Sequence, residues 1–111
     1  MYGSIMRARI KDGKKDAYLD FLRELLPTAE DYGNGLHSVE LAWEASDPQR
    51  VVAIIHFADR DSYVANANRP ETDADFRRQL EFFEGEPEWL DLDYVGYMGK
   101  PMTATVGAGV A

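Results

Sequence analysis

The hydrophobic positions of the chain follow two periods, which separate predicted strands from predicted helices. Residues 3–10 and 36–44 alternate between two faces, and this period of two is typical of strands. Residues 51–57 (VVAIIHF) are apolar on both faces, which predicts a strand that is covered on both sides. Residues 90–98 (LDLDYVGYM) predict the last strand. One face of the second strand is expected to hold His37, Val39, Leu41 and Trp43.

A period of three to four residues marks the helices. An apolar stripe through residues 17–29 predicts an amphipathic helix, and Pro27 predicts a kink or a short restart within it. A short helix is expected over residues 61–67. Thr72, with Asp75 three residues on, resembles a capping box, and the helix that it starts is expected to end at Gly85.

Glycine, asparagine and proline place the turns. Residues 32–35 (YGNG) supply positive-φ positions that end the first helix, and Asp47-Pro48 predicts the turn between the second and third strands. The stretch 99–111 (GKPMTATVGAGVA) predicts a loosely ordered tail, which leaves 1–98 as the folded domain.

This order of elements predicts the fold class. Strand, helix, strand, strand, one or two helices and strand form two split β-α-β units. Such units give a ferredoxin-like α+β sandwich, in which a four-stranded antiparallel sheet carries helices on one face. Because residues 51–57 are apolar on both faces, the face that helices cannot reach needs a different cover.

Composition narrows the classes of partner. The 111 residues suit one domain, and 12 Lys and Arg against 20 Asp and Glu give a net charge of −8. This acidity argues against a nucleic-acid backbone and against an anionic membrane surface. Much of the negative charge lies in residues 71–93, which we interpret as a solvated helix face; a docking surface for a basic partner is the alternative.

Other chemistry is excluded by what the sequence lacks. The absence of cysteine excludes a disulfide framework, a thiolate nucleophile and a Cys-ligated metal. No signal-peptide pattern opens the chain, and the aliphatic run at 51–55 is too short to span a bilayer, so a cytoplasmic location is expected. Phosphate-binding glycine loops, a serine-hydrolase elbow and a zinc-protease helix are also missing.

Histidines and arginines are the candidate polar groups. His37 or His56 could act as a general base near neutral pH, although we favour a buried imidazole paired with a backbone group or a carboxylate. No carboxylate at ligand spacing supports a metal. Arg7 and Arg9 could hold an anionic or phenolate-like ligand. The interpretation that we favour for both arginines is cross-strand pairing with Asp91 and Asp93.

Aromatic and amide side chains are candidates for a pocket. Trp43, Phe57, Tyr94 and Tyr97 could line an apolar pocket, although aromatic residues in strands are more often ordinary core. The pair Asn66 and Asn68 could orient a ligand carbonyl, and helix C-capping explains both equally well.

Several segments of the chain together resemble those of a known protein family. The run from Met6 through Lys11-Asp12-Gly13-Lys14, the helix with FLREL at 21–25, Gly35, and VVAIIHFADRDSYVANA at 51–67 resemble the antibiotic biosynthesis monooxygenase-like family over residues 3–98. The resemblance implies a homodimeric α+β barrel in which two sheets meet and enclose apolar pockets. It would put Ile55 and Phe57 into the pocket and turn His56 toward the helices.

The resemblance also implies a kind of chemistry. Members with known activity oxidise polycyclic aromatic substrates without metal or flavin, degrade haem, or act on small signalling molecules. This chain has Phe57 where the family commonly has Trp, and Asn66 or Ala67 where a His often follows. The missing His argues against haem, so no cofactor is expected.

The sequence leaves two main functions open and a third that has less support. One is a cofactor-independent monooxygenase acting on a small aromatic or quinol-like molecule, and the other is a non-catalytic dimeric small-molecule-binding protein. The third is a protein-docking module that uses residues 71–93. For the enzyme, the expected catalytic groups are His37, Arg9 and Asn66, and the expected ligand contacts are Arg7, Trp43, Ile55, Phe57 and Tyr94.

Overall fold

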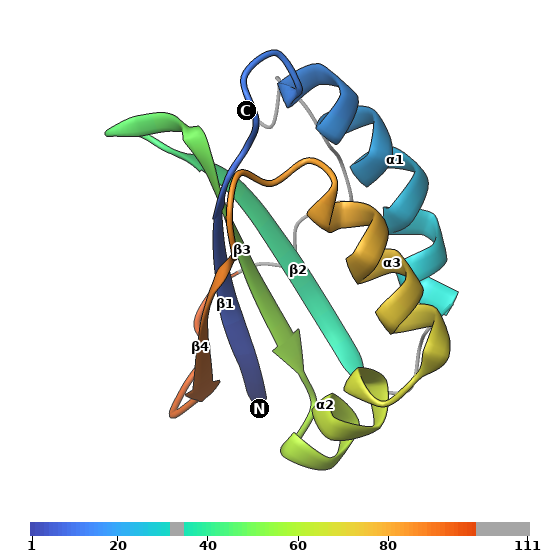
Figure 1. Ribbon diagram of the computed structural model, residues 1–111. Coiled ribbons are helices and arrows are strands. Elements are labelled where there is room, and N and C mark those ends of the chain that lie inside the picture. The colour runs from blue at the N-terminus through green and yellow to red at the C-terminus, as the bar shows by residue number, and fades with distance from the viewer. Residues whose placement is uncertain (32–34, 100–111) are drawn as a thin grey trace.

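The structure, a computed structural model, describes residues 1–31 and 35–99, and of residues 26–31 it describes the backbone alone. The sheet has the order β2-β3-β1-β4, and each neighbouring pair is antiparallel (Figure 1). In chain order the elements are β1 (Tyr2–Arg9), α1 (Lys15–Asp31), β2 (Leu36–Glu44), β3 (Asp47–Phe57), α2 (Arg60–Ala67), α3 (Pro70–Leu80) and β4 (Glu88–Asp93).

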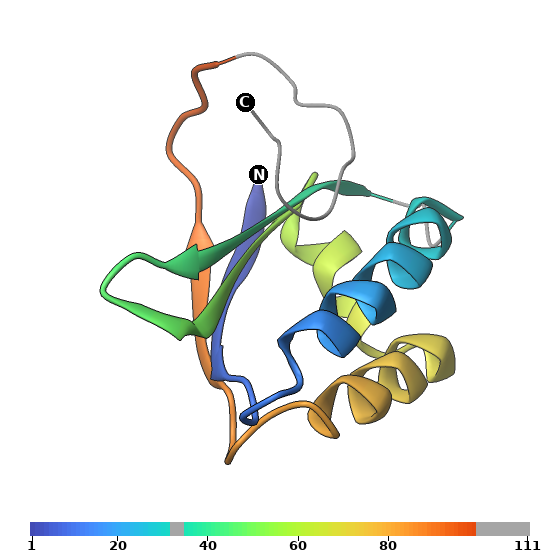
Figure 2. The same cartoon turned by 90° about the horizontal axis from the view of Figure 1, so that it is seen from above.

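All three of these helices lie on one side of the sheet. Seen from above, α1 and α3 run beside each other on that side, and β4 forms the outer edge of the sheet (Figure 2). The predicted fold is therefore confirmed as a ferredoxin-like α+β sandwich with a four-stranded antiparallel sheet. The other side, which we call the helix-free face, carries no helix of the described residues.

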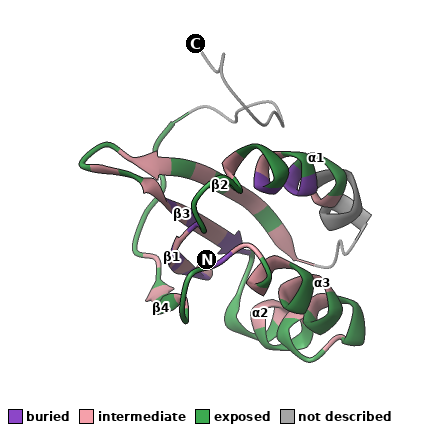
Figure 3. Ribbon diagram, turned by 45° about the horizontal axis from the view of Figure 1, so that its top comes forward, coloured by how far each residue is buried: buried purple, intermediate pink, exposed green. Residues whose placement is uncertain are grey.

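The core lies between the sheet and the helices, and Figure 3 shows the buried residues concentrated there. In β1 the predicted alternation is confirmed, because Met6 and Ala8 are buried while Arg7 between them is partly exposed. Burial of apolar surface of this kind is the main favourable contribution to folding. The core cluster consists of Met6, Ala8, Ile10, Tyr18, Phe21, Leu22, Val51, Ala53 and Phe83.

Two helix boundaries differ from prediction. Helix α1 continues through Pro27 to Asp31 as one element, so the expected restart is wrong. Loss of one backbone donor at a proline removes one hydrogen bond, which a helix of 17 residues tolerates. Helix α3 begins at Pro70 and ends at Leu80, whereas Thr72 and Gly85 were the expected limits. Proline suits the first helical position, where no backbone donor is needed, so no Thr72 cap is required.

The turns were also placed imperfectly from the sequence. Asp47 and Pro48 already belong to β3, and the hairpin turn lies at residues 45–46. Gly35 has φ +95°, and a Cβ on it would collide with Ser62 at the start of α2. Glycine is therefore required at this position. The remainder of the predicted 32–35 turn and of the predicted 99–111 tail, residues 32–34 and 100–111, lies outside the described residues.

Strand β4 is shorter than expected. It ends at Asp93, and residues 94–98 leave the sheet, although the Tyr94 amide still donates to the Met1 carbonyl at 3.0 Å. As an edge strand β4 has a partner on one side alone, β1. Within the described residues, no helix is long and apolar enough to cross a membrane.

Candidate functional site

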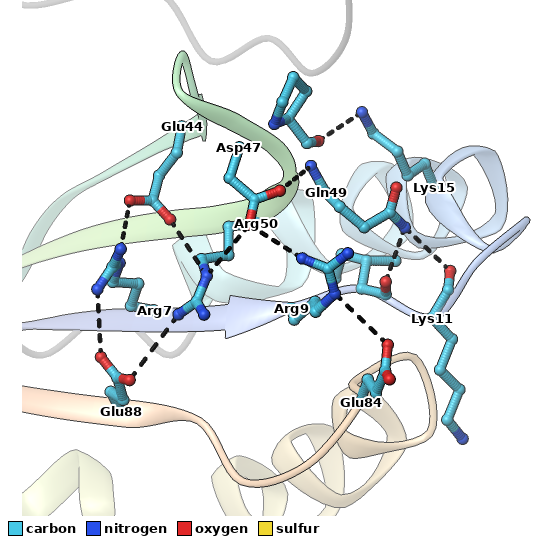
Figure 4. A network of polar contacts seen from close by, with 12 residues as sticks. Arg7, Arg9, Lys11, Lys15, Glu44, Asp47, Gln49, Arg50, Glu84 and Glu88 are labelled. Atoms are coloured by element: carbon cyan, nitrogen blue, oxygen red, sulfur yellow. Dashed lines mark hydrogen bonds and ion pairs between the residues drawn. The ribbon is translucent and has the colours of Figure 1, made fainter.

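Arg7 and Arg9 belong to an ion-pair network at one end of the helix-free face (Figure 4). Arg7 Nη2 lies 2.7 Å from Glu44 Oε1, and Arg9 Nη1 lies 2.9 Å from Asp47 Oδ2. The hydrogen bond and the charge of Glu44 raise the pKa of the Arg7 guanidinium. Longer pairs join Arg7 to Glu88, Arg9 to Glu84, and Arg50 to Glu44, Asp47 and Glu88.

The favoured interpretation of the arginines is thus correct in kind and wrong in its partners. Carboxylates do neutralise Arg7 and Arg9, but Asp91 and Asp93 are not those carboxylates. In the β1–β4 ladder Arg7 stands opposite Glu88, whereas Asp91 stands opposite Ser4. Side chains alternate along a strand, so Asp91 and Asp93 lie on the helix side of the sheet, away from both arginines.

The last two residues of β3, His56 and Phe57, point to opposite sides of the sheet, and each belongs to a different candidate site. Phe57 is buried on the helix side, and its ring lies 5.5 Å from the ring of Tyr63 on α2. His56 must then point to the opposite side, where its Nε2 lies 3.0 Å from Glu40 Oε1. The expectation that His56 turns toward the helices is therefore wrong.

On the helix side, five side chains form what we call the helix-facing cluster: Tyr2, Ser4, Phe57, Tyr63 and Asp91. The Tyr63 hydroxyl donates to Asp91 Oδ1 at 3.1 Å, and the Tyr2 and Tyr63 rings are 5.2 Å apart. Strand β1 supplies Tyr2 and Ser4, while β3, α2 and β4 supply one residue each. The cluster thus joins a carboxylate, a phenol and an aliphatic hydroxyl, with aromatic rings around them.

The polar atoms of this cluster differ in burial, because Asp91 is exposed and Tyr63 is partly buried, whereas Ser4 is fully buried. Ser4 has no exposed surface, and its hydroxyl makes no hydrogen bond of ordinary geometry with any described residue. Burial raises the pKa of Tyr63, and the hydrogen bond to Asp91 raises it further, whereas the nearby Ser4 hydroxyl lowers it. Tyr63 therefore remains a neutral hydrogen-bond donor at neutral pH.

Two predicted site residues border the helix-facing cluster. Ile55 stands directly opposite Ser4 in the β1–β3 ladder. Asn66 lies three residues after Tyr63 on α2, so the two share a helix face. The Asn66 amide oxygen accepts from the Thr72 hydroxyl at 3.5 Å, which ties α2 to α3. Together with Phe57, these residues are the part of the predicted site that the fold brings together.

A second group, the histidine cluster, lies on the helix-free face and consists of His37, Glu40, His56, Tyr94 and Tyr97. The Tyr94 ring lies 4.6 Å from the His56 ring, and the His37 ring lies 6.4 Å from it. Tyr97 reaches the His37 ring at 6.1 Å. Burial raises the pKa of Tyr94, and the charge of Glu40 adds to this effect.

The two histidines meet because the β2–β3 ladder is irregular. Leu36 pairs with Phe57 and Ser38 with His56, so His37 is an extra residue in β2. Its ring therefore joins His56 instead of the face that holds Val39. The favoured interpretation of a buried, carboxylate-paired imidazole is confirmed for His56 and wrong for His37, which is exposed.

The remaining predicted residues lie elsewhere. Trp43 packs near the start of α1, where its ring lies 6.4 Å from that of Tyr18 and 4.2 Å from Lys15 Nζ. Trp43 pairs with Val51, six residues before Phe57, a separation of about 20 Å along a strand. No group of three or more His, Asp or Glu side chains suited to a metal occurs among residues 1–31 and 35–99.

Sequence reasoning missed Ser4, Tyr63, Asp91 and Glu40 as site residues. Ser4 carried a weak signal, because it is the one small polar residue on the otherwise apolar or aromatic face of the first strand. Asp91 was assigned to the arginines, and Tyr63 lies in a helix with little amphipathic pattern. Their proximity depends on how α2 crosses the end of the sheet, which local patterns do not encode.

Comparison with known proteins gives similarity of fold. No protein-family model matches this sequence, and no curated protein is significantly similar to it. A solved structure named as an antibiotic biosynthesis monooxygenase superimposes with a TM-score of 0.72 at 19% identity, over 86% of this chain and 100% of the other.

Two further solved structures carry that name provisionally. The protein from Caulobacter crescentus has a TM-score of 0.76 at 14% identity, over 86% of this chain and 90% of its own. The protein from Nitrosomonas europaea has a TM-score of 0.75 at 16% identity, over 88% and 93%. At these identities the similarity shows the fold, and at that level the resemblance predicted from the sequence is confirmed.

Proposed function

We propose that this chain, which has the fold of antibiotic biosynthesis monooxygenase-like proteins, is a cofactor-independent oxygenase for a small hydroxyaromatic or quinol-like molecule. The observation that carries the proposal is the helix-facing cluster. It sets the Tyr63–Asp91 hydrogen bond beside the fully buried Ser4 hydroxyl and between aromatic rings. These groups suit a flat substrate that must lose a proton.

Each polar group has a distinct task in this proposal. Asp91 is the general base, and Tyr63 relays the proton to it. The Tyr63 hydroxyl gives its own proton to the Asp91 carboxylate, and at the same time it takes the proton of the substrate hydroxyl. The Ser4 hydroxyl, which makes no hydrogen bond of ordinary geometry within the described part of the chain, donates to the substrate oxygen as negative charge develops there. Tyr2 and Phe57 hold the substrate ring, and Asn66 orients a substrate carbonyl.

The substrate anion then reacts with O₂ at a ring carbon that bears one hydrogen, conjugated with the deprotonated oxygen. One oxygen atom remains on that carbon as a carbonyl, the deprotonated oxygen becomes a second carbonyl, and the other oxygen atom leaves as water with the ring hydrogen and the proton that the hydroxyl lost, so one O₂ is consumed for each product. The substrate supplies all the electrons. The protein contributes orientation, exclusion of water and stabilisation of the anion.

We further propose that two copies associate through the helix-free face. This face carries an apolar band that no described helix covers, and exposed apolar patches of this kind mark association surfaces. Leu90 in the band is 59% exposed. The band consists of Ile5, Val52, Ile54, Leu90 and Leu92, which neighbour one another across β3, β1 and β4. Sedimentation equilibrium tests this part, because a particle of the chain mass, 12.5 kDa, at low micromolar concentration would contradict it.

Oxygen consumption with dihydroxyanthracene-type substrates tests the enzyme. Asp91→Asn and Tyr63→Phe are expected to lower the rate by about a hundred-fold to ten-thousand-fold, since general-base catalysis contributes roughly that much. Asp93→Asn is the matched control, because Asp93 lies two residues on in β4, whereas the Tyr63 hydroxyl donates to Asp91. Its rate is expected to equal that of the wild type.

The alternative function is a binding protein without chemistry. It is favoured by the exposure of Asp91, which gives this carboxylate no shielding from water. Ligand-induced thermal stabilisation with no oxygen uptake for any hydroxyaromatic compound would overturn the enzyme and support the alternative. Equal rates for Asp91→Asn and the wild type would remove Asp91 from the mechanism.

A further inference from the structure

The histidine cluster lies on the opposite side of the sheet from the proposed catalytic residues and has no task in the reaction. His56 is 6% exposed, and its Nδ1 has no hydrogen-bond partner among the described residues. The Tyr94 hydroxyl above it is equally unpartnered. A buried polar group without a partner is destabilising, because burial removes its hydrogen bonds to water and nothing replaces them. The cluster is therefore incomplete in the single chain.

Apolar side chains continue from this cluster along the segment that follows β4. Val95 and Met98 are fully or almost fully exposed, at 106% and 97%, and Tyr97 is half-exposed. The segment adjoins Leu92 at the end of the apolar band. The band, the segment and the histidine cluster thus form one continuous surface, and a second copy of this chain would cover all three.

The charges around the two imidazoles are unequal. Glu40 of β2 accompanies His56, and β1 presents the uncharged Gly3 opposite it. Residues after β4 contribute the phenols of Tyr94 and Tyr97, and burial raises the pKa of Tyr94, so its phenol is neutral near pH 7.

His37 has no carboxylate contact within the described part of the chain. Its Nδ1 lies 3.2 Å from the Ser38 hydroxyl, and its nearest titratable ring neighbours are His56 and Tyr97. A proton on His37 would therefore place in the covered surface a positive charge that no carboxylate of the described residues contacts, close to a second imidazole whose own contact is Glu40. Burial without a partner disfavours that charge strongly.

We infer that protonation of His37 opposes the association of two copies through the helix-free face, which makes the assembly acid-sensitive. The inference rests on the homodimer of the proposed function. Imidazole side chains change charge between about pH 5 and pH 8. Because association disfavours the protonated form, the dimer is stable where imidazole is neutral, and it weakens as acid protonates the exposed ring.

At Gly3 the backbone packs tightly against its neighbours on this surface. A Cβ on Gly3 would collide with the Ile55 carbonyl oxygen and lie 3.2 Å from Tyr94 Cε2. Glycine thus leaves the space in which the Tyr94 ring covers His56. This packing keeps the two imidazoles and Tyr97 together at the edge of the surface that the second copy would meet.

Sedimentation velocity between about pH 7.5 and pH 5.5 tests the inference. For the wild type, the dimer dissociation constant is expected to rise about ten-fold or more over this range. His37→Gln removes the titrating group and is expected to change less than about three-fold. Asn68→His is the matched control, because it places a histidine at the exposed C-cap of α2 on the helix side and should keep the wild-type profile.

The outcomes separate this inference from the proposals on which it rests. A monomer at every pH would overturn both the homodimer and the inference. A dimer whose dissociation constant does not change with pH would overturn the inference and leave the homodimer standing. The same acid response in His37→Gln as in the wild type would overturn the role of His37. Circular dichroism at each pH shows that the chain remains folded.

Discussion

The two faces of the sheet differ in how their polar groups are satisfied. On the helix side, Ser4 is completely buried within an otherwise apolar core, and Tyr63 with Asp91 forms a small polar group at its border. On the helix-free face, the polar groups gather at two ends. The ion pairs of Arg7 and Arg9 occupy one end, and the histidine cluster occupies the other.

This difference separates two properties that a single apolar sheet could have combined. Polar atoms buried among aromatic rings suit recognition of a small molecule, because water competes poorly there. An apolar band between two polar ends suits association, because the polar ends define the orientation of the partner. The helix side therefore accounts for the proposed chemistry, and the helix-free face for the proposed assembly.

The largest expected effect contrasts a core residue with one on the helix-free face. Met6→Ala is expected to lower the free energy of unfolding by about 2–5 kcal/mol, because Met6 is 2% exposed and its loss leaves a cavity. Leu90→Ala should cost less than about 1 kcal/mol of the folding of the single chain. Urea denaturation at several protein concentrations measures both. Equal, concentration-independent losses would show that the two faces contribute alike.

An intermediate effect concerns alkaline pH. Burial raises the pKa of Tyr18, so its neutral form stabilises the fold below pH about 10, and this contribution is lost as the pH rises further. Tyr18→Phe is expected to cost about 1 kcal/mol at neutral pH through its lost hydrogen bond to Gln79, and to flatten the alkaline decline. Tyr94→Phe, on the less buried side, should flatten it less. Thermal denaturation from about pH 7 to 11 compares them, and identical profiles for the two variants would contradict the difference in burial.

The smallest effect is expected in the ion-pair network. Arg9→Gln should change the free energy of unfolding by less than about 1 kcal/mol, because its pairs with Asp47 and Glu84 are solvent-exposed. Binding of a hydroxyaromatic ligand should remain unchanged, since Arg9 points away from the helix-facing cluster. Calorimetric titration of the variant checks this. A ten-fold loss of affinity would restore Arg9 as a ligand contact.

Periodicity predicted the fold well because the spacing of apolar residues within each strand or helix shows which of its faces is buried. The alternation in the first strand put Met6 and Ala8 on one face, which the structure buries, and the apolar character of residues 51–57 predicted a face that helices do not cover. Boundaries were less certain. The hairpin turn and the start of α3 depend on pairing and on the proline at the first helical position, both of which override simple turn signals.

The candidate site was only partly predictable from the sequence. Phe57, Ile55 and Asn66 were chosen, and the fold brings them to the helix-facing cluster. His37 was predicted on the face that holds Val39, but it lies on the opposite face because one extra residue in β2 reverses the alternation there. No local sequence pattern indicates this irregularity. Contacts such as Tyr63 with Asp91 join residues 28 positions apart and depend on the tertiary arrangement.

The measurement that tests the division between the two faces most directly is an NMR titration with a dihydroxyanthracene. Backbone amide shifts are followed for the whole chain as the ligand is added. If the ligand binds at the helix-facing cluster, the perturbed amides are expected to be those of Ser4, Phe57, Tyr63 and Asp91 on the helix side. Perturbation confined to Val52, Ile54 and His56 would place the ligand on the helix-free face and contradict the account.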